Sequence, residues 1–257
     1  MIYRILFLGD IVGKPGRTAI RQGLPSLKET YKPLFTIVNG ENSAAGHGIT
    51  PDIADELLAQ GVDAITLGNH AFNRKEAYNY IQQSTKIARP YNMVAKTPGR
   101  GLVQISKDGV DLAVANLCGR VYLEGYDNPF TAFDEIYQNA TGHLFVDFHG
   151  EVTSEKIAMG WHAAGRATAL VGTHTHVQTA DERILEDYTA YITDVGMSGP
   201  ENGVIGTDKE PVLYRFRTGL PARFEVADGP GVICGVMIEV ERDSGRAVHI
   251  ERVRLAT

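Results

Sequence analysis

The segment Ala167-Thr168-Ala169-Leu170-Val171-Gly172-Thr173-His174-Thr175-His176 joins an apolar run to two histidines that lie two positions apart. Short apolar runs bounded by turn residues are typical of buried strands, so we expect a strand over 167–171. Residues two apart in an extended backbone point to the same side, which aims both imidazoles in one direction. Such a pair at a strand end is suited to bind a metal ion, although a polar loop with two surface histidines would read the same way.

Four further segments repeat this design, in which an apolar run leads to a carboxylate, an amide or an imidazole. The expected strands are 5–8, 35–38, 64–67 and 143–148. Functional residues in open α/β sheets gather beyond the carboxyl ends of the strands, so we expect the five strand ends to form one site. The side chains that these ends supply are Asp10, Glu41, Asn42, Asn69, His70, His149, His174 and His176.

Taken singly, several of these residues have another explanation. Asp10 and Glu41 suit the N-caps of following helices, Asn69 suits a turn, and His149 could be an isolated buried histidine. Their repetition at five strand ends favours a metal site. Nitrogen and oxygen ligands without thiolates favour Mn, Fe, Zn or Co over Cu(I) or an iron–sulfur cluster. Two such ions roughly 3.5–4 Å apart can clamp a phosphate and hold a bridging hydroxide.

The order of these motifs resembles the calcineurin-like metallophosphoesterases, whose motifs are D-x-H, G-D-x-x-D, G-N-H-[DE], H and G-H-x-H. The chain has Gly68-Asn69-His70, His149 and the segment 172–176. It departs from the pattern in three places. Ile11-Val12 replaces the first-motif histidine, Glu41 stands where an aspartate usually bridges the metals, and Ala71 replaces the acidic residue after His70.

These departures resemble a narrower group, the YmdB-like bacterial phosphodiesterases. The segments that carry the resemblance are Phe7-Leu8-Gly9-Asp10-Ile11-Val12-Gly13, Asn39-Gly40-Glu41-Asn42 and Asp194-Val195-Gly196-Met197. The resemblance implies a four-layer αββα sandwich, a bridging glutamate, and substrates that include 2',3'-cyclic nucleotides. It implies His70 as the catalytic acid and, as metal ligands, Asp10, Glu41, Asn42, Asn69, His149, His174 and His176.

The expected function is therefore hydrolysis of small phosphodiesters by a hydroxide that bridges two divalent or mixed-valence ions, with Fe or Mn first and Zn or Co next. Glu41 would join one site of Asp10, Asn42 and His176 to a second site of Asn69, His149 and His174. Asn42 could instead bind the phosphate of the substrate. The alternatives are a phosphomonoesterase or 5'-nucleotidase, and a non-catalytic regulatory protein that uses the fold as a ligand sensor.

Other residues near these motifs remain open. His47 lies between two glycines just after Asn42 and is a candidate substrate contact. Lys14 and Arg17 follow Asp10 and could approach a phosphate, although exposed basic residues are usually solvated. Asp194 could accept a proton from a ligand imidazole, or could be a turn aspartate. The glycine-rich loop 198–206 is expected near the substrate entrance.

The composition is that of a globular α/β protein, with 257 residues, 43% hydrophobic and 22% charged. We expect one domain over 1–257, with helices at 17–29, 51–60, 75–83, 129–137 and 155–162 and strands within 183–192 and 231–253. A net charge of −6 does not indicate the basic surface that binding of long nucleic acid requires. With no membrane-helix run or signal peptide, we expect a cytoplasmic protein, with Cys118 and Cys234 as buried thiols. Homo-oligomer formation stays open.

Overall fold

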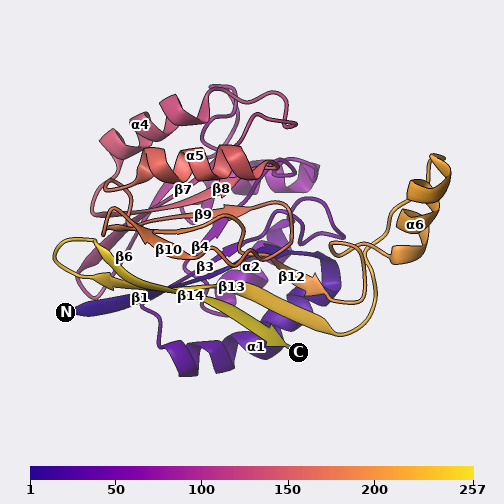
Figure 1. Ribbon diagram of the computed structural model, residues 1–257, viewed down its shortest axis with the longest axis horizontal. Coiled ribbons are helices and arrows are strands. Elements are labelled where there is room, and N and C mark those ends of the chain that lie inside the picture. The colour runs from indigo at the N-terminus through magenta and orange to yellow at the C-terminus, as the bar shows by residue number, and fades with distance from the viewer.

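The computed structural model describes all residues from 1 to 257, and its strands form two sheets that lie face to face (Figure 1). The first sheet has the order β2-β12-β13-β1-β3-β4-β5, and β14 pairs with β13. Its strands are β1 (Ile2–Leu8), β2 (Asp10–Ile11), β3 (Phe35–Asn39), β4 (Ala64–Thr66), β5 (Ile87–Ala88), β12 (Met197–Pro200), β13 (Gly231–Glu241) and β14 (Ala247–Ala256). The second sheet has the order β10-β11-β9-β8-β7-β6, with β6 (Leu102–Lys107), β7 (Val110–Cys118), β8 (His143–His149), β9 (Ala169–Thr173), β10 (Arg183–Leu185) and β11 (Thr189–Ile192).

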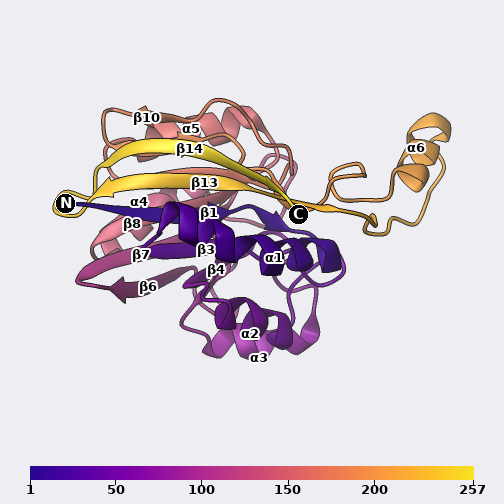
Figure 2. The ribbon, with the colours of Figure 1, turned by 90° about the horizontal axis from the view of Figure 1, so that it is seen from below.

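Helices cover the outer face of each sheet, which confirms the expected αββα sandwich (Figures 1 and 2). The helices against the first sheet are α1 (Gly13–Tyr31), α2 (Pro51–Ala59), the 3-10 turn η1 (Lys75–Ala77) and α3 (Tyr78–Gln83). Those against the second sheet are α4 (Pro129–Asn139) and α5 (Thr153–Ala163). Because helices cover the outer face of each sheet and the other sheet covers its inner face, the central parallel strands are buried on both faces.

Three apolar cores fill the spaces between the four layers. In β1, Ile5 and Phe7 lie between the two sheets, whereas Leu6 and Leu8 pack against the helices. In β8, Phe145 lies between the sheets, whereas Val146 packs against α4 and α5. This two-residue alternation decides which polar side chains later in each strand point into the space between the sheets.

The expected helices are present, with small shifts at their ends. The first one begins at Gly13 rather than at position 17, because the glycine- and proline-containing turn 13–17 is its first turn. The segment 75–83 begins as a 3-10 turn before it becomes α-helical. Both cysteines are buried free thiols, as predicted.

Besides the short strands β2, β5 and β12, two larger parts of the fold were not predicted from the sequence. One is the hairpin of β6 and β7, which turns at Asp108 and Gly109, both with positive φ. The other is α6 (Lys209–Thr218), which stands apart from the sandwich in both views (Figures 1 and 2) and buries only Val212. None of the helices combines the length and apolar character needed to cross a membrane.

Candidate metal centre

The strand ends bring the predicted side chains together at one edge of the sandwich. Glu41 follows β3, Asn69 follows β4, His149 is the last residue of β8, and His174 follows β9. The strands β3 and β4 are parallel neighbours in one sheet, and β8 and β9 are parallel neighbours in the other. The site therefore lies across the boundary between the two sheets, with ligand candidates from both.

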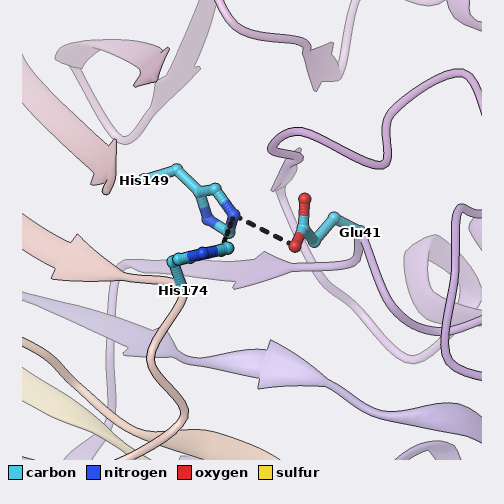
Figure 3. A group of neighbouring side chains, drawn as sticks. All are labelled: Glu41, His149 and His174. Carbon is cyan, nitrogen blue, oxygen red and sulfur yellow. Dashed lines mark hydrogen bonds and ion pairs between the residues drawn. The ribbon is translucent and has the colours of Figure 1, made fainter. Parts of the chain in front are cut away.

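One group, which we call the His149 half, consists of Asn69, His149 and His174. The Nε2 atom of His149 lies 2.9 Å from Asn69 Oδ1 and 2.9 Å from His174 Nδ1. The same Nε2 atom lies 3.0 Å from Oε1 of Glu41 (Figure 3). Glu41, His149 and His174 each place a ligand atom within 4.8 Å of the other two, so one cation could contact all three.

The hydrogen-bond partners around the His149 half imply that acceptor atoms face one another, because the Thr173 hydroxyl already donates to Asp147. Burial lowers the pKa of His149 to about 4 and that of His174 to about 3, so both rings are neutral at pH 7. Each ring has one N–H, and the other nitrogen has a lone pair. His149 uses Nδ1–H toward Thr173 Oγ1 at 2.9 Å, and His174 uses Nε2–H toward Glu151 at 3.0 Å. Two lone pairs therefore meet at 2.9 Å, which only a cation between them would make favourable.

The second group, which we call the His176 half, consists of Asp10, Asn42 and His176. His176 Nε2 lies 3.9 Å from Asp10 Oδ1, while its Nδ1 donates to the carbonyl of Ile205 at 2.8 Å. The Nδ2 group of Asn42 reaches Oε1 of Glu41 at 3.1 Å and His176 Nε2 at 3.2 Å. Asp10 Oδ1 and Asn42 Oδ1 are buried without a hydrogen-bond partner.

Glu41 stands where the two halves meet. Its Oε1 contacts both His149 and Asn42, and its Oε2 accepts from the backbone N–H of His70 at 3.2 Å. Burial raises the pKa of Asp10, an effect that the nearby His176 opposes. The two carboxylates and the orphaned oxygens make a buried cluster that fits divalent cations, since hard and borderline ions prefer such oxygen and imidazole ligands.

A buried polar layer, formed by Asn39, Thr66, Asp147 and Thr173, lies directly beneath the ligand candidates. The period of two places these residues between the sheets, in line with Ile37, Ala64, Phe145 and Val171 of the apolar core. Asp147 accepts hydrogen bonds from all three other members. Burial raises the pKa of Asp147 to about 7, and the hydrogen bonds from Thr173 and Thr66 oppose that rise. Sequence reasoning missed this layer, although the alternation in each strand is visible in the sequence.

Asp194 supports the histidine turn but contacts neither imidazole. It accepts from the backbone N–H and the hydroxyl of Thr175, and it pairs with the buried Lys156 at 2.6 Å. His174 and His176 have φ values of 97° and 65°, in a region that costs non-glycine residues energy. The hydrogen bonds from Thr175 to Asp194 fix the residue between the two histidines, and they thereby stabilise the strained turn.

Four of the ligand candidates line a cavity of about 330 Å³, namely Glu41, Asn42, His174 and His176. His70 and His47 line it, with their rings 4.6 Å apart at an interplanar angle of 63°. The Nδ2 atom of Asn73 lies 3.0 Å from His70 Nδ1, so an amide and not a carboxylate stands beside this nitrogen. Burial lowers the pKa of His70. Two segments that flank α6, 205–207 and 224–226, close the cavity on one side.

The basic residues after Asp10 lie outside this cavity. Arg17 lies 3.9 Å from Glu56, and Lys14 lines a separate hollow beside Gly229. The loop 198–206 reaches the cavity only through Ile205 and Gly206, because its first residues belong to β12. The residues that line the cavity without having been proposed for the site are Val12, Ala45, Gly46, Glu151, Thr175, Thr207, Phe224, Glu225 and Val226.

Comparison with known proteins identifies relatives over nearly the whole chain. The family model described as YmdB-like protein matches residues 6–253. A Bacillus subtilis protein named 2',3'-cyclic-nucleotide 2'-phosphodiesterase is 50% identical over 253 residues, which cover 97% of this chain and 96% of that protein.

Solved structures give the same result for the fold. A Mycoplasma pneumoniae protein described as a novel phosphatase is 34% identical, with a TM-score of 0.95, and the match covers 100% of this chain and 94% of the other. A Thermus thermophilus protein described as hypothetical is 37% identical, with a TM-score of 0.91 over 98% of this chain and 99% of the other.

Proposed function

The chain belongs to the YmdB-like protein family, and from that premise we propose that it is a metal-dependent phosphodiesterase acting on small phosphodiesters such as 2',3'-cyclic nucleotides. The observation that carries the proposal is the contact of His149 Nε2 with three other acceptor atoms at 2.9–3.0 Å. A buried cluster of lone pairs with no hydrogen between them is unfavourable without a cation, so the chain retains it for metal binding.

We propose two metal positions that share Glu41. The His149 half would hold one ion, and the His176 half would hold the other, with Asn42 either as a ligand or as a donor to the phosphate. When bound, two divalent ions stabilise charge on the phosphoryl oxygens and lower the pKa of a bound water toward ~7. The donor set contains no thiolate, in keeping with Fe, Mn, Zn or Co.

The chain's own residues then position the substrate and move one proton. His70 lies at the cavity wall beside the ligand cluster, with its Nδ1 against the amide of Asn73. Its Nε2 atom is free to donate a proton to the departing sugar oxygen. General acid catalysis of this kind typically raises the reaction rate ~100- to 10,000-fold. His47, which packs against His70, is a candidate contact for the substrate.

A second candidate reaction is hydrolysis of phosphomonoesters. The relative from Mycoplasma pneumoniae is described as a phosphatase, and it is 34% identical in a match that covers 100% of this chain and 94% of that one. The same cavity could admit a nucleoside monophosphate, because both substrates present phosphoryl oxygens to the same ligands.

The experiment is a side-by-side assay of metal-reconstituted protein on 2',3'-cyclic AMP and on 3'-AMP and 5'-AMP. We expect the cyclic diester to be hydrolysed with the higher kcat/KM, and the activity to vanish after chelation and to return with Mn²⁺. Faster hydrolysis of a monoester would favour the second candidate. Undiminished activity in the fully chelated protein would contradict the metal-dependent mechanism.

A further inference from the structure

We propose that Asp147 is the positioning residue of the metal centre and acts on ligands from both sheets through the polar layer. The proposal rests on the metal centre proposed above. Asp147 touches neither the cavity nor a ligand atom, and its side chain is fully buried. It is nevertheless connected to two of the ligand candidates by one intervening residue each.

The first connection runs to His149. The hydroxyl of Thr173 donates to Asp147 Oδ1 at 2.6 Å. Since that hydroxyl has a single hydrogen, its contact with His149 Nδ1 at 2.9 Å requires the imidazole to be the donor. Asp147 therefore fixes the direction of the chain of hydrogen bonds, which leaves the lone pair of His149 on Nε2, the atom that faces Glu41.

The second connection runs to Glu41. The amide nitrogen of Asn39 donates to Asp147 Oδ2 at 2.9 Å, and this sets which way the amide faces. The Asn39 oxygen then accepts from the backbone N–H of Glu41 at 3.1 Å. The Asn39 nitrogen also donates to the carbonyl of Leu67 at 3.0 Å, so the segment that leads to Asn69 is tied to the same group.

The cost of this arrangement argues for a functional role. A buried carboxylate is expensive to desolvate, and an apolar side chain is often at least as stabilising in such a place. Two positions before Asp147, the same strand β8 places the apolar side chain of Phe145 in the core between the sheets. The next inward position of β8 is occupied by the carboxylate of Asp147. Hydroxyl and amide donors from both sheets converge on this carboxylate, directly beneath the ligand candidates.

The inference is tested by measuring Zn²⁺ binding to the full chain after its metal has been removed, by competition with a chromophoric chelator. Thr173→Val deletes the hydroxyl at constant shape, and Thr173→Ala deletes it without adding a new methyl group. Because loss of a partner behind a ligating histidine typically costs about 10–100-fold in metal affinity, we expect a loss of that size in both variants. Thr173→Ser keeps the hydroxyl and should bind Zn²⁺ nearly as the unchanged protein does.

Thr189→Val is the matched control. Thr189 is also a fully buried threonine, and its hydroxyl accepts from Gly165 N–H at 3.0 Å and donates to the carbonyl of Ala167 at 2.6 Å. It belongs to β11, at the opposite end from the metal centre. Circular dichroism of the metal-free proteins during heating measures stability, and we expect Thr189→Val to lower the unfolding temperature without changing Zn²⁺ affinity.

Three results would overturn the proposal. Unchanged Zn²⁺ affinity in Thr173→Val and Thr173→Ala would remove the positioning role. An equal loss in Thr189→Val would show that affinity merely follows stability. Failure of both Thr173 variants to fold would make the layer a requirement of the fold. If the unchanged protein binds no Zn²⁺, the proposed function itself fails, so the two failures are distinguishable.

Discussion

The two halves of the candidate centre differ in how their polar atoms are satisfied. In the His149 half, lone pairs face one another at 2.9–3.0 Å, and the ring of His149 is held from behind by Thr173 and Asp147. In the His176 half, the amide of Asn42 donates to both Glu41 and His176, so part of the group is already hydrogen-bonded. A cation entering the His149 half relieves repulsion, whereas one entering the His176 half displaces existing hydrogen bonds.

The supports of the two halves differ as well. His149 belongs to a central strand and is anchored in the interior between the sheets. His176 is anchored by the backbone carbonyl of Ile205, which lies in the segment that leads out to α6. The difference leads us to expect two metal positions of unequal affinity, with the His149 half filled first. Four variants test this comparison and the roles assigned around it, from the largest expected effect to the smallest.

His149→Ala should have the largest effect. It removes a ligand from the pre-organised half, and because a partner behind such a histidine is itself worth about 10–100-fold, we expect more than about 100-fold loss of Zn²⁺ affinity. Phosphodiester hydrolysis should fall with it. Chelator competition and turnover measure both quantities, and His249→Ala, at an exposed histidine on β14, is the control. Full metal content with normal turnover would show that His149 is not a ligand.

His70→Ala should keep its metals and lose turnover by ~100- to 10,000-fold on a 2',3'-cyclic nucleotide, because a nucleoside alkoxide needs a proton to leave. A nitrophenyl diester, whose leaving group has a pKa near ~7, should be affected far less. Equal losses on both substrates would mean that His70 positions the phosphate instead of protonating the product.

The same variant tests the pH dependence. Burial lowers the pKa of His70 below its usual 6.5, so the protonated form that acts as an acid is lost as the pH rises through a value below 6.5. The rate on the cyclic nucleotide should therefore have an alkaline limb that begins below pH 6.5 and that disappears in His70→Ala. An identical pH profile in the variant would assign that limb to another group.

Asp10→Asn should have a smaller effect that is confined to the His176 half. The carboxamide keeps the shape of the side chain but loses its charge, so we expect the weaker metal position to lose on the order of 10-fold in affinity. The tighter position should be unchanged. A two-step metal titration separates the two, and a loss confined to the tighter step would reverse the assignment of the halves.

Lys14→Gln should have the smallest effect. Lys14 lines a hollow beside Gly229 and not the cavity of the metal centre, so we expect its loss to change substrate binding by less than about 0.5 kcal/mol, or roughly 2-fold. The KM for the cyclic nucleotide should change by no more than that. A large increase in KM would place Lys14 in contact with the substrate phosphate during turnover.

The sequence contained enough to predict the layers and the proximity of the ligand candidates at the strand ends. Each apolar run ending in a polar residue marked a strand end, and parallel strands bring their ends together. The prediction considered only potential metal ligands beyond each apolar run, so it missed Asp147, which lies inside β8, and Thr173, the last residue of β9. Alternation places them on one face, but the sequence does not say which face is shared by the two sheets.

The region around α6 was the least predictable. Its apolar residues, among them Leu213, Tyr214 and Phe216, are exposed rather than packed against a sheet. A short helix without a packed face gives only a weak signal, because most helical stability comes from tertiary contacts. The β6–β7 hairpin, in contrast, was predictable from the sequence, because Asp108-Gly109 is a recognisable hairpin-turn sequence.

The central claim is that Glu41 joins two unequal metal positions. Anomalous scattering from crystals soaked at increasing Mn²⁺ tests it directly. We predict one peak among Glu41, His149 and His174 at low Mn²⁺, and a second peak among Glu41, Asp10 and His176 at higher Mn²⁺. A single peak at saturating Mn²⁺, or two peaks with Glu41 turned away from both, would contradict the account.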